Sequence, residues 1–269
     1  MIVQSAPPDE PRFVITMAQH TTFAGCLARA FGNDAFEPVE PRDVVLYIVD
    51  NHDAGWADLD GEGRIDPATG LPYNLVQTPF AEIVKTSAAS PEFNSRRHAY
   101  CGLLSSMHSW GLYNGRYGMS DHVLLDSLAA ENRSTAEGML NGELDRQARL
   151  KHALAENPDT ASWMDEAQVM QNYKQLQFFD TMALYFNCNG AADRKPQTFT
   201  HVPKSRDEDA TVALTPRDDA TYALDPYPFA EDGLEVSFAG RYLAPMRDAA
   251  NVDLEAIDAE WQTVRLVAG

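Results

Sequence analysis

One aspartate in this sequence stands where a folded chain would place an apolar residue. Asp180 lies inside the run FFDTMALYF (residues 178–186), and helical periodicity puts it on a stripe of apolar side chains. An unpaired carboxylate on such a stripe would cost several kcal/mol or would have to keep its proton. The chain must therefore fold so that a positive charge reaches Asp180, and this requirement limits the arrangement of everything around it.

Three more polar residues occupy apolar faces of two earlier predicted helices. His20 lies on the apolar face of the segment QHTTFAGCLARAF, residues 19–31. A second helix is predicted to begin near Pro41 and to run through the apolar stretch that ends in His52 and Asp53. With Asp180 on a long helix over about residues 162–188, the four polar residues come from three helices.

A shared metal ion would satisfy these buried groups together. Nearby cationic side chains are few: Lys85 and Lys174, with Arg96 and Arg97 one helix away. One histidine alone is more simply a core residue bonded to a carbonyl, and Asp180 alone could pair with an arginine. The coincidence of the four favours a divalent ion, and two His with two Asp suit Zn, Mn, Fe, Ni or Mg. The predicted metal ligands are His20, His52, Asp53 and Asp180.

The sequence after Ala191 changes from helical to strand-like patterns. Five short segments rich in β-branched residues follow one another, separated by Pro, Gly and Asp, which is typical of a small antiparallel sheet. We therefore expect a mainly α fold with a small antiparallel β appendage at the C-terminus. Residues 1–191 would form the helical metal-binding domain, and residues 192–269 a β-rich appendage packed on that core. Residues 57–78 are expected to form a long ordered loop, and Ser90-Pro91 to open a helix.

Longer motifs carry a resemblance to a known superfamily. They are ITMAQH (residues 15–20), HDAGWADLDGEGRIDPATGLPYNL (52–75), SSMHSWGLY (105–113), FFDTMALYF (178–186) and DPYPF (225–229). The order His20, His52-Asp53, Asp180 resembles the HD superfamily of metal-dependent phosphohydrolases. The longer motifs resemble, over nearly the whole chain, an HD-like bacterial family of unknown function. The resemblance implies an HD-like helical core that binds a metal through these four residues.

The resemblance leaves the reaction open between two chemistries. HD-like proteins include hydrolases of nucleotides and phosphoesters and a smaller branch of di-iron oxygenases. Dinuclear members add two histidines, and this chain offers His98 and His108. On one continuous helix these two would be about 15 Å apart, too far to bind one ion. One metal is favoured and a second stays open, with His108 as a further ligand, a group that orients a ligand, or a general acid.

The function expected is hydrolysis of a small phosphoester or nucleotide by a metal-bound water. Asp53 would bind the metal and orient the water, and Asp60 on the following loop would accept its proton. Arg64, Arg96 and Arg97 are candidates for holding the phosphate, and Trp56 for lining the pocket or packing the loop. The alternatives are a di-iron oxygenase and a non-catalytic ligand-binding module in which the metal is structural. His122, His152 and His201 are expected to be solvated.

Composition limits the partners of the protein. Against 40 Asp and Glu there are only 21 Lys and Arg, a formal charge of −19 that would repel DNA or RNA. Cys26, Cys101 and Cys188 lie singly in apolar segments, as reduced core cysteines do, and the sequence contains neither an export signal nor a membrane span. We therefore expect a cytoplasmic protein with a small-molecule substrate. A homo-oligomer stays open.

Overall fold

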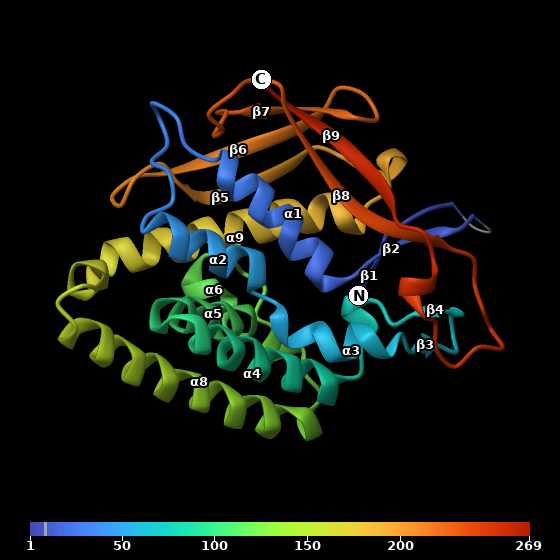
Figure 1. The fold of residues 1–269 in the computed structure, drawn as a ribbon, viewed down its shortest axis with the longest axis horizontal. Coiled ribbons are helices and arrows are strands. Elements are labelled where there is room, and N and C mark those ends of the chain that lie inside the picture. Colours follow the sequence, from blue (N-terminus) through green and yellow to red (C-terminus); the bar gives the residue numbers. More distant parts are fainter. Residues whose placement is uncertain (8–9) are drawn as a thin grey trace.

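The elements of the protein stack in layers (Figure 1), as seen in a computed structural model that describes residues 1–7 and 10–269. A large curled sheet forms one layer, two central helices lie against it, and further helices pack on these from the other side. The helices are α1 (Met17–Ala30), α2 (Arg42–Asn51), α3 (Ala57–Glu62), α4 (Phe80–Arg97), α5 (Ala99–Tyr113), α6 (Gly115–Gly118), α7 (Leu124–Ser127), α8 (Ala130–Glu156) and α9 (Glu166–Cys188).

The main sheet takes strands from both ends of the chain. Its order is β1-β2-β8-β9-β7-β6-β5, and every neighbouring pair is antiparallel except β7 and β9, which are parallel. Helix α1 packs on β8 and helix α9 on β5. The strands are β1 (Ile2–Val3), β2 (Arg12–Ile15), β5 (Gln197–Pro203), β6 (Asp209–Pro216), β7 (Thr221–Asp225), β8 (Leu234–Leu243) and β9 (Glu260–Ala268), and a separate hairpin joins β3 (Ile65–Asp66) to β4 (Leu71–Pro72).

The prediction of a mainly α fold with a small antiparallel β appendage is wrong. About 51% of the residues are helical, and the seven-stranded sheet is a major layer of the protein. The five strand-like segments after Ala191 do form β5–β9. The prediction failed because β2 pairs with β8, which lies more than 200 residues later, and pairing at that distance leaves no mark on local sequence patterns.

The sheet and the helices share one hydrophobic core. The expected boundary after Ala191 falls between α9 and β5, yet β1 and β2 of the same sheet precede it. Phe23 of α1 packs on Phe238 of β8 with ring centroids 4.9 Å apart, and Phe178 of α9 packs on Phe199 of β5 at 5.5 Å. The central helices are therefore held in place by the sheet as well as by the other helices.

The start of α1 places His20 next to the sheet. Strand β2 ends at Ile15, and Thr16 caps the helix at once: its hydroxyl accepts a hydrogen bond from the Gln19 N–H, and the Gln19 side chain accepts one from the Thr16 N–H. This capping box fixes where the helix begins. His20 consequently lies in the first turn of α1, with its backbone N–H bonded to the Thr16 carbonyl at 3.0 Å.

The segment expected as a loop, residues 57–78, is largely structured, which corrects that prediction. It contains α3, the β3–β4 hairpin and a short 3-10 helix, Leu75–Gln77. Gly63, at a φ of 56°, ends α3, and a side chain there would collide with the Val252 carbonyl. The polar and glycine-rich composition hid these elements because each is only a few residues long.

Helix α4 runs through Ser90-Pro91 instead of starting there. It begins at Phe80 and ends at Arg97, and His98, in an extended conformation, separates it from α5. Pro91 has no N–H to bond the carbonyl of Ser87, four residues earlier. The hydroxyl of Ser109, on α5, donates to that carbonyl at 2.8 Å. The neighbouring helix thus supplies the hydrogen bond that the proline removes, next to His108.

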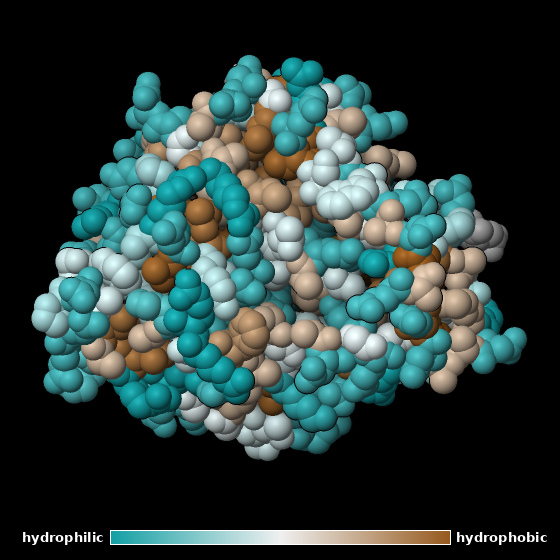
Figure 2. All heavy atoms as spheres, in the orientation of Figure 1, coloured by the Kyte–Doolittle hydropathy of each residue, from teal (hydrophilic) through white to brown (hydrophobic). Residues whose placement is uncertain are grey.

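The outer surface matches the acidic composition. Hydrophilic residues cover most of the face in Figure 2, and apolar residues reach the surface only in separate small patches. None of the helices in the described part of the chain combines the length and the hydropathy needed to cross a lipid bilayer.

Replacement of Ser109 by Ala should destabilise the protein by about 0.5–1.5 kcal/mol, because it leaves the partly buried Ser87 carbonyl without its donor. In a Pro91→Ala background the same replacement should cost less, since alanine, unlike proline, has an N–H that can bond that carbonyl. Denaturant unfolding of the double-mutant cycle measures the difference. Ser106→Ala is the control, because the Ser106 hydroxyl donates to the Glu143 carbonyl on α8 and not to α4. An equal cost of Ser109→Ala in both backgrounds would contradict the argument.

Candidate metal centre

Three helices bring four of the predicted residues together in the core. His20 comes from the first turn of α1, His52 caps the C-terminus of α2, and Asp180 lies on α9. Nε2 of His20 is 3.2 Å from Oδ1 of Asp180, and Nε2 of His52 is 3.6 Å from the same oxygen. Asp53 follows directly after α2, and its Oδ2 is 3.6 Å from Nε2 of His52. Both histidines and Asp180 are buried.

The backbone fixes which nitrogen of His52 faces this cluster. Nδ1 lies 2.8 Å from the carbonyl oxygen of Val49, which can only accept, so Nδ1 carries a proton. In the neutral ring Nε2 then has a lone pair. Nε2 is fully buried and has no hydrogen-bond partner among the described residues. A buried ring nitrogen with this orientation is what a metal-binding histidine needs.

His20 is oriented in the same way by a side chain. Oδ1 of Asn187, one helical turn before the end of α9, lies 2.9 Å from Nδ1 of His20. An amide oxygen only accepts, so the proton is on Nδ1 and the lone pair of the neutral ring is on Nε2. This lone pair points at Oδ1 of Asp180. Two nitrogen lone pairs and a carboxylate oxygen therefore converge, and they repel one another unless a cation lies among them.

The distances fit a metal ion as that cation. An ion bound tetrahedrally at 2.0–2.1 Å sets its ligand atoms about 3.4 Å apart. The separations of 3.2, 3.6 and 3.6 Å within the cluster are close to that value. Two sets of side chains have ligand atoms mutually within 4.8 Å: His20, His52 and Asp53, and His52, His108 and Asp180. The pairwise spacings thus suit a metal ion, neither set contains all four predicted ligands, and His52 is common to both sets.

Without a metal, a proton on His52 takes the place of the cation. Burial disfavours the charged ring, but the carboxylates of Asp53 and Asp180 outweigh burial and raise the pKa of His52 to about 9. Burial also acts against the Asp180 anion, yet the imidazoles of His20 and His52 beside it hold its pKa well below the usual range. A metal ion and this proton therefore compete for the same lone pair.

His108 faces the cluster from α5 and differs from the other histidines. Its ring centroid is 5.1 Å from that of His52. The side-chain amide nitrogen of Gln177 donates to Nδ1 of His108 at 2.7 Å, so the proton of the neutral ring is on Nε2. Burial lowers the pKa of His108 to about 4 and keeps the ring neutral. In this orientation His108 is a hydrogen-bond donor toward the centre; it could bind a metal only if the Gln177 amide turned over.

The candidate metal centre is accessible to solvent at Asp53. Its side chain is 15% exposed, compared with 0% for His52 and 4% for Asp180. It precedes the 3-10 helix Ala54–Trp56, in which Gly55 packs so tightly against α4 that a side chain would collide with the Thr86 carbonyl. The Gly55 N–H also bonds the Ser90 hydroxyl at 2.9 Å. The close contact holds Asp53 at the edge of the centre, where water can reach it.

Two other residues singled out in the sequence have structural contacts. The carboxylate of Asp60, predicted to accept a proton, instead receives hydrogen bonds from the Met17 N–H and the Met1 amino group, at the start of α1. It belongs to neither set of converging ligands among the described residues. Trp56 is 5% exposed and packs in the main hydrophobic core. Both hold the segment after α2 against the N-terminal strands and α1.

The three arginines that were expected to hold phosphate lie away from the centre, and so does His98. Arg64 stacks over Tyr73, Arg96 is 74% exposed beside Glu92, and Arg97 stacks over Tyr47. His98 caps α5, where its Nδ1 accepts from the N–H of Tyr100 at 3.1 Å. Helix α5 continues through Gly102 without a break, so His98 and His108 remain about ten residues apart on a rigid rod.

Sequence reasoning missed three residues that contact the centre. Arg116 reaches to 3.9 Å from Oδ2 of Asp180, Gln177 holds His108, and Asn187 holds His20. Gln177 and Asn187 lie on α9 at distances of three and seven from Asp180, so helical periodicity could have identified them. Arg116 stands in a polar segment with an unusual backbone, and no local pattern marks it.

Comparison with known proteins gives a family but no activity. A family model described as "Protein of unknown function (DUF3891)" matches residues 1–245. No curated protein and no solved structure matches the chain significantly.

The stabilisation that a metal gives should increase with pH. The folded pKa of His52, about 9, exceeds the ordinary value of 6.5. Its contribution to the stability of the metal-free protein is therefore complete below pH 6.5 and is lost as pH rises toward 9. Metal binding must displace the same proton, so affinity should rise about tenfold per pH unit in that window. Thermal unfolding with chelator and with Mn²⁺ or Zn²⁺, between pH 6.5 and 9, should show a widening gap in Tm.

His152, exposed beside Glu156, provides the control for this titration. His152→Ala should leave the widening unchanged, whereas His52→Gln should abolish it. A gap that stays constant with pH in the wild-type protein would mean that His52 does not bind the ion.

Proposed function

Because this chain belongs to the family described as Protein of unknown function (DUF3891), we propose its function from its own residues: a metal-dependent hydrolase of the HD-like type. Its substrate would be a small phosphoester or nucleotide. The observation that carries the proposal is the convergence of Nε2 of His20, Nε2 of His52 and Oδ1 of Asp180 in the core, while Arg116 lies 3.9 Å from the other oxygen of Asp180, Oδ2. A metal bound there would lower the pKa of a water ligand and polarise a phosphoryl oxygen.

The protein side chains divide the remaining work. Asp53 is the partly exposed carboxylate, and it orients the attacking water by accepting one of its protons in a hydrogen bond. The water oxygen forms a bond to phosphorus, and the bond from phosphorus to the leaving oxygen breaks. His108, neutral and with a proton on Nε2, is placed to donate a hydrogen bond to the leaving oxygen, which takes up the proton that the attacking water releases through Asp53. Asp60 has no part in this scheme, since its two oxygens accept from Met1 and Met17.

Hydrolysis is preferred over the other two functions for structural reasons. A di-iron oxygenase would need His98 and His108 on one second iron, but His98 caps the far end of α5. A purely structural metal would have a closed set of ligands. Asp53 is instead partly exposed, which leaves room for water at the centre.

The location we propose follows from the cysteines. Cys26, Cys101 and Cys188 are free, and burial raises the pKa of each thiol, so the buried Cys101 and the partly buried Cys26 and Cys188 have little reactive thiolate and suit a reducing compartment such as the cytoplasm. With its large negative charge the protein is expected to act on a small molecule and not on a nucleic acid.

Elemental analysis and turnover test the proposal together. Protein purified without added metal should hold about one equivalent of a divalent ion, and Asp180→Asn should lose it. Asp53→Asn should lower the hydrolysis of p-nitrophenyl phosphate and of nucleotides by at least about a hundredfold. Asp126→Asn, at an exposed carboxylate beside Arg133, is the matched control and should change neither. Wild-type protein without metal, or Asp53→Asn with full activity, would refute the proposal.

A further inference from the structure

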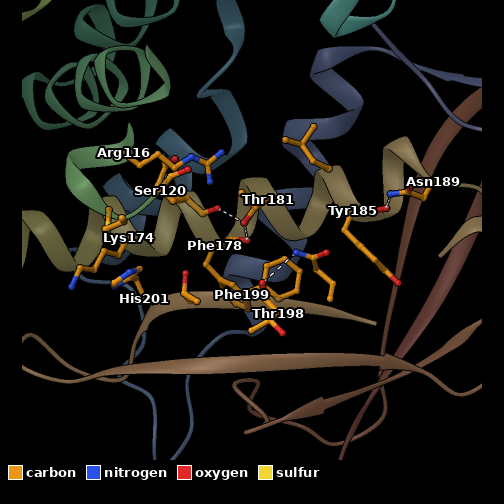
Figure 3. A pocket seen from close by; sticks show the side chains of 15 residues that line it. Arg116, Ser120, Lys174, Phe178, Thr181, Tyr185, Asn189, Thr198, Phe199 and His201 are labelled. Carbon is orange, nitrogen blue, oxygen red and sulfur yellow. Dashed lines mark hydrogen bonds between the residues drawn. The ribbon is translucent and has the colours of Figure 1, made fainter. Parts of the chain in front are cut away.

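A hollow of about 490 Å³ lies between α9, β5 and the short turn α6 (Figure 3). Its size is in the range of sites for small ligands. Two residues of its wall contact the metal centre directly. Arg116 is 3.9 Å from Oδ2 of Asp180, and Gln177 donates to His108 at 2.7 Å. The hollow and the centre therefore share these two side chains.

The wall of the hollow contains basic side chains and, among the described residues, no acidic ones, in a protein that is strongly negative. It includes Arg116, Lys174 and His201, and none of the fifteen described residues that line it is Asp or Glu. Behind this wall Asp209 pairs with Lys174 at 2.6 Å and with His201 at 3.6 Å. The Arg116 guanidinium, 25% exposed, makes no hydrogen bond to any described residue. Among the described residues, Arg116 is thus the cation in this wall that pairs with a carboxylate only at 3.9 Å and keeps its hydrogen-bond donors for a further anion.

Backbone strain is concentrated at the same place. Three non-glycine residues of the described chain have positive φ: Arg116 (52°), Tyr117 (59°) and His201 (57°). Arg116 and His201 line the hollow from two different elements, α6 and a bulge in β5. Such conformations are costly for side chains other than glycine and persist at sites where geometry serves a function.

The strained turn is held firmly from one side. The Tyr117 ring lies 4.7 Å from that of Trp110 and 5.0 Å from that of Tyr173, and its hydroxyl donates to Gln147 at 3.2 Å. This packing anchors Tyr117, while the adjacent Arg116 lines the hollow (Figure 3) and lies 3.9 Å from Oδ2 of Asp180. A glycine would adopt the same turn without strain, so the side chain at position 116 is kept at a cost.

We propose that this hollow is the substrate site, with Arg116 binding the phosphate group of a phosphate monoester whose organic part carries hydroxyl groups. This rests on the proposed function. The guanidinium, beside Asp180, would hold the phosphate at the edge of the metal centre. Thr181, Thr198 and Asn189 offer hydroxyl and amide groups to the organic part, and Phe178 and Phe199 give it an apolar wall.

Binding of ribose 5-phosphate, measured by calorimetry, tests the role of Arg116. Arg116→Asn should weaken binding about 10- to 100-fold, because one charge-assisted contact is lost. Asn tolerates the left-handed backbone, so the Tm of the variant should not fall. Arg116→Lys keeps the charge and should recover part of the affinity. If binding is unchanged in Arg116→Asn while its Tm drops, Arg116 is a structural partner of Asp180 and the proposal is wrong.

A steric block tests the hollow without touching the centre. Thr200, exposed on β5, lines the hollow, whereas Thr215, exposed on β6, does not. Thr200→Trp should abolish binding of ribose 5-phosphate and raise KM in turnover, and Thr215→Trp should match the wild type. Binding that survives Thr200→Trp would place the substrate elsewhere.

Measurement with and without metal separates this proposal from the proposed function. Chelator-treated protein should still bind ribose 5-phosphate through Arg116, so binding there supports the hollow even if no hydrolysis is found. Metal-dependent hydrolysis that neither Arg116→Asn nor Thr200→Trp affects would instead support the function and overturn the assignment of the hollow.

Discussion

The attraction between the Asp180 carboxylate and a shared positive charge is the interaction on which this structure depends. Asp180 is buried, and its partners come from other elements, His20 from α1, His52 from α2 and Arg116 from α6, so the charge is compensated when these elements pack on α9. A buried carboxylate that loses its partners is strongly destabilising. The sheet takes part, since α1 and α9 both pack on it. Assembly of the centre and assembly of the fold are therefore one event.

Side-chain amides on α9 set the register of this assembly. Because α9 lies between the sheet and the other helices, most of its surface is buried, and its polar residues need partners inside the protein (Figure 1). Asn172 donates to the Glu40 carbonyl at 2.7 Å and Gln175 to the Glu37 carbonyl at 3.2 Å. Gln177 and Asn187 bond the rings of His108 and His20. The same helix thus carries Asp180 and orients two of the imidazoles around it.

Local patterns in the sequence predicted the elements better than their assembly. The helices that carry His20, His52 and Asp180 and the five strands after Ala191 follow from periodicity and turn residues. The pairing of β2 with β8 and the parallel pairing of β7 with β9 depend on distant segments, so the sheet was underestimated. Pro91 misled for a related reason: Ser109 on another helix repairs the hydrogen bond that the proline removes.

Part of the candidate site could be predicted from the sequence, because ionisable side chains are rarely buried unless a partner compensates their charge. A carboxylate or an imidazole on an apolar stripe is visible in the sequence, and the structure brings those residues together. Exposed arginines carry no such signal, and Arg64, Arg96 and Arg97 were chosen only for their position in the chain. The contact of Arg116 with Asp180 could not be predicted, because it depends on a left-handed backbone turn that has no clear sequence pattern here.

The charges around the centre alternate from the inside outward. At the C-terminus of α2, Nδ1 of His52 donates a hydrogen bond to the Val49 carbonyl. This end of the helix is the negative end of its dipole and favours a cation beside it. Asp180 follows that cation, and Arg116 follows Asp180 on the side of the hollow. The phosphate that we propose for the hollow would be the next charge in the series. A protein of net charge −19 can therefore attract an anionic ligand at this point, since the local order of charges, and not their sum, sets the field that the ligand meets at close range.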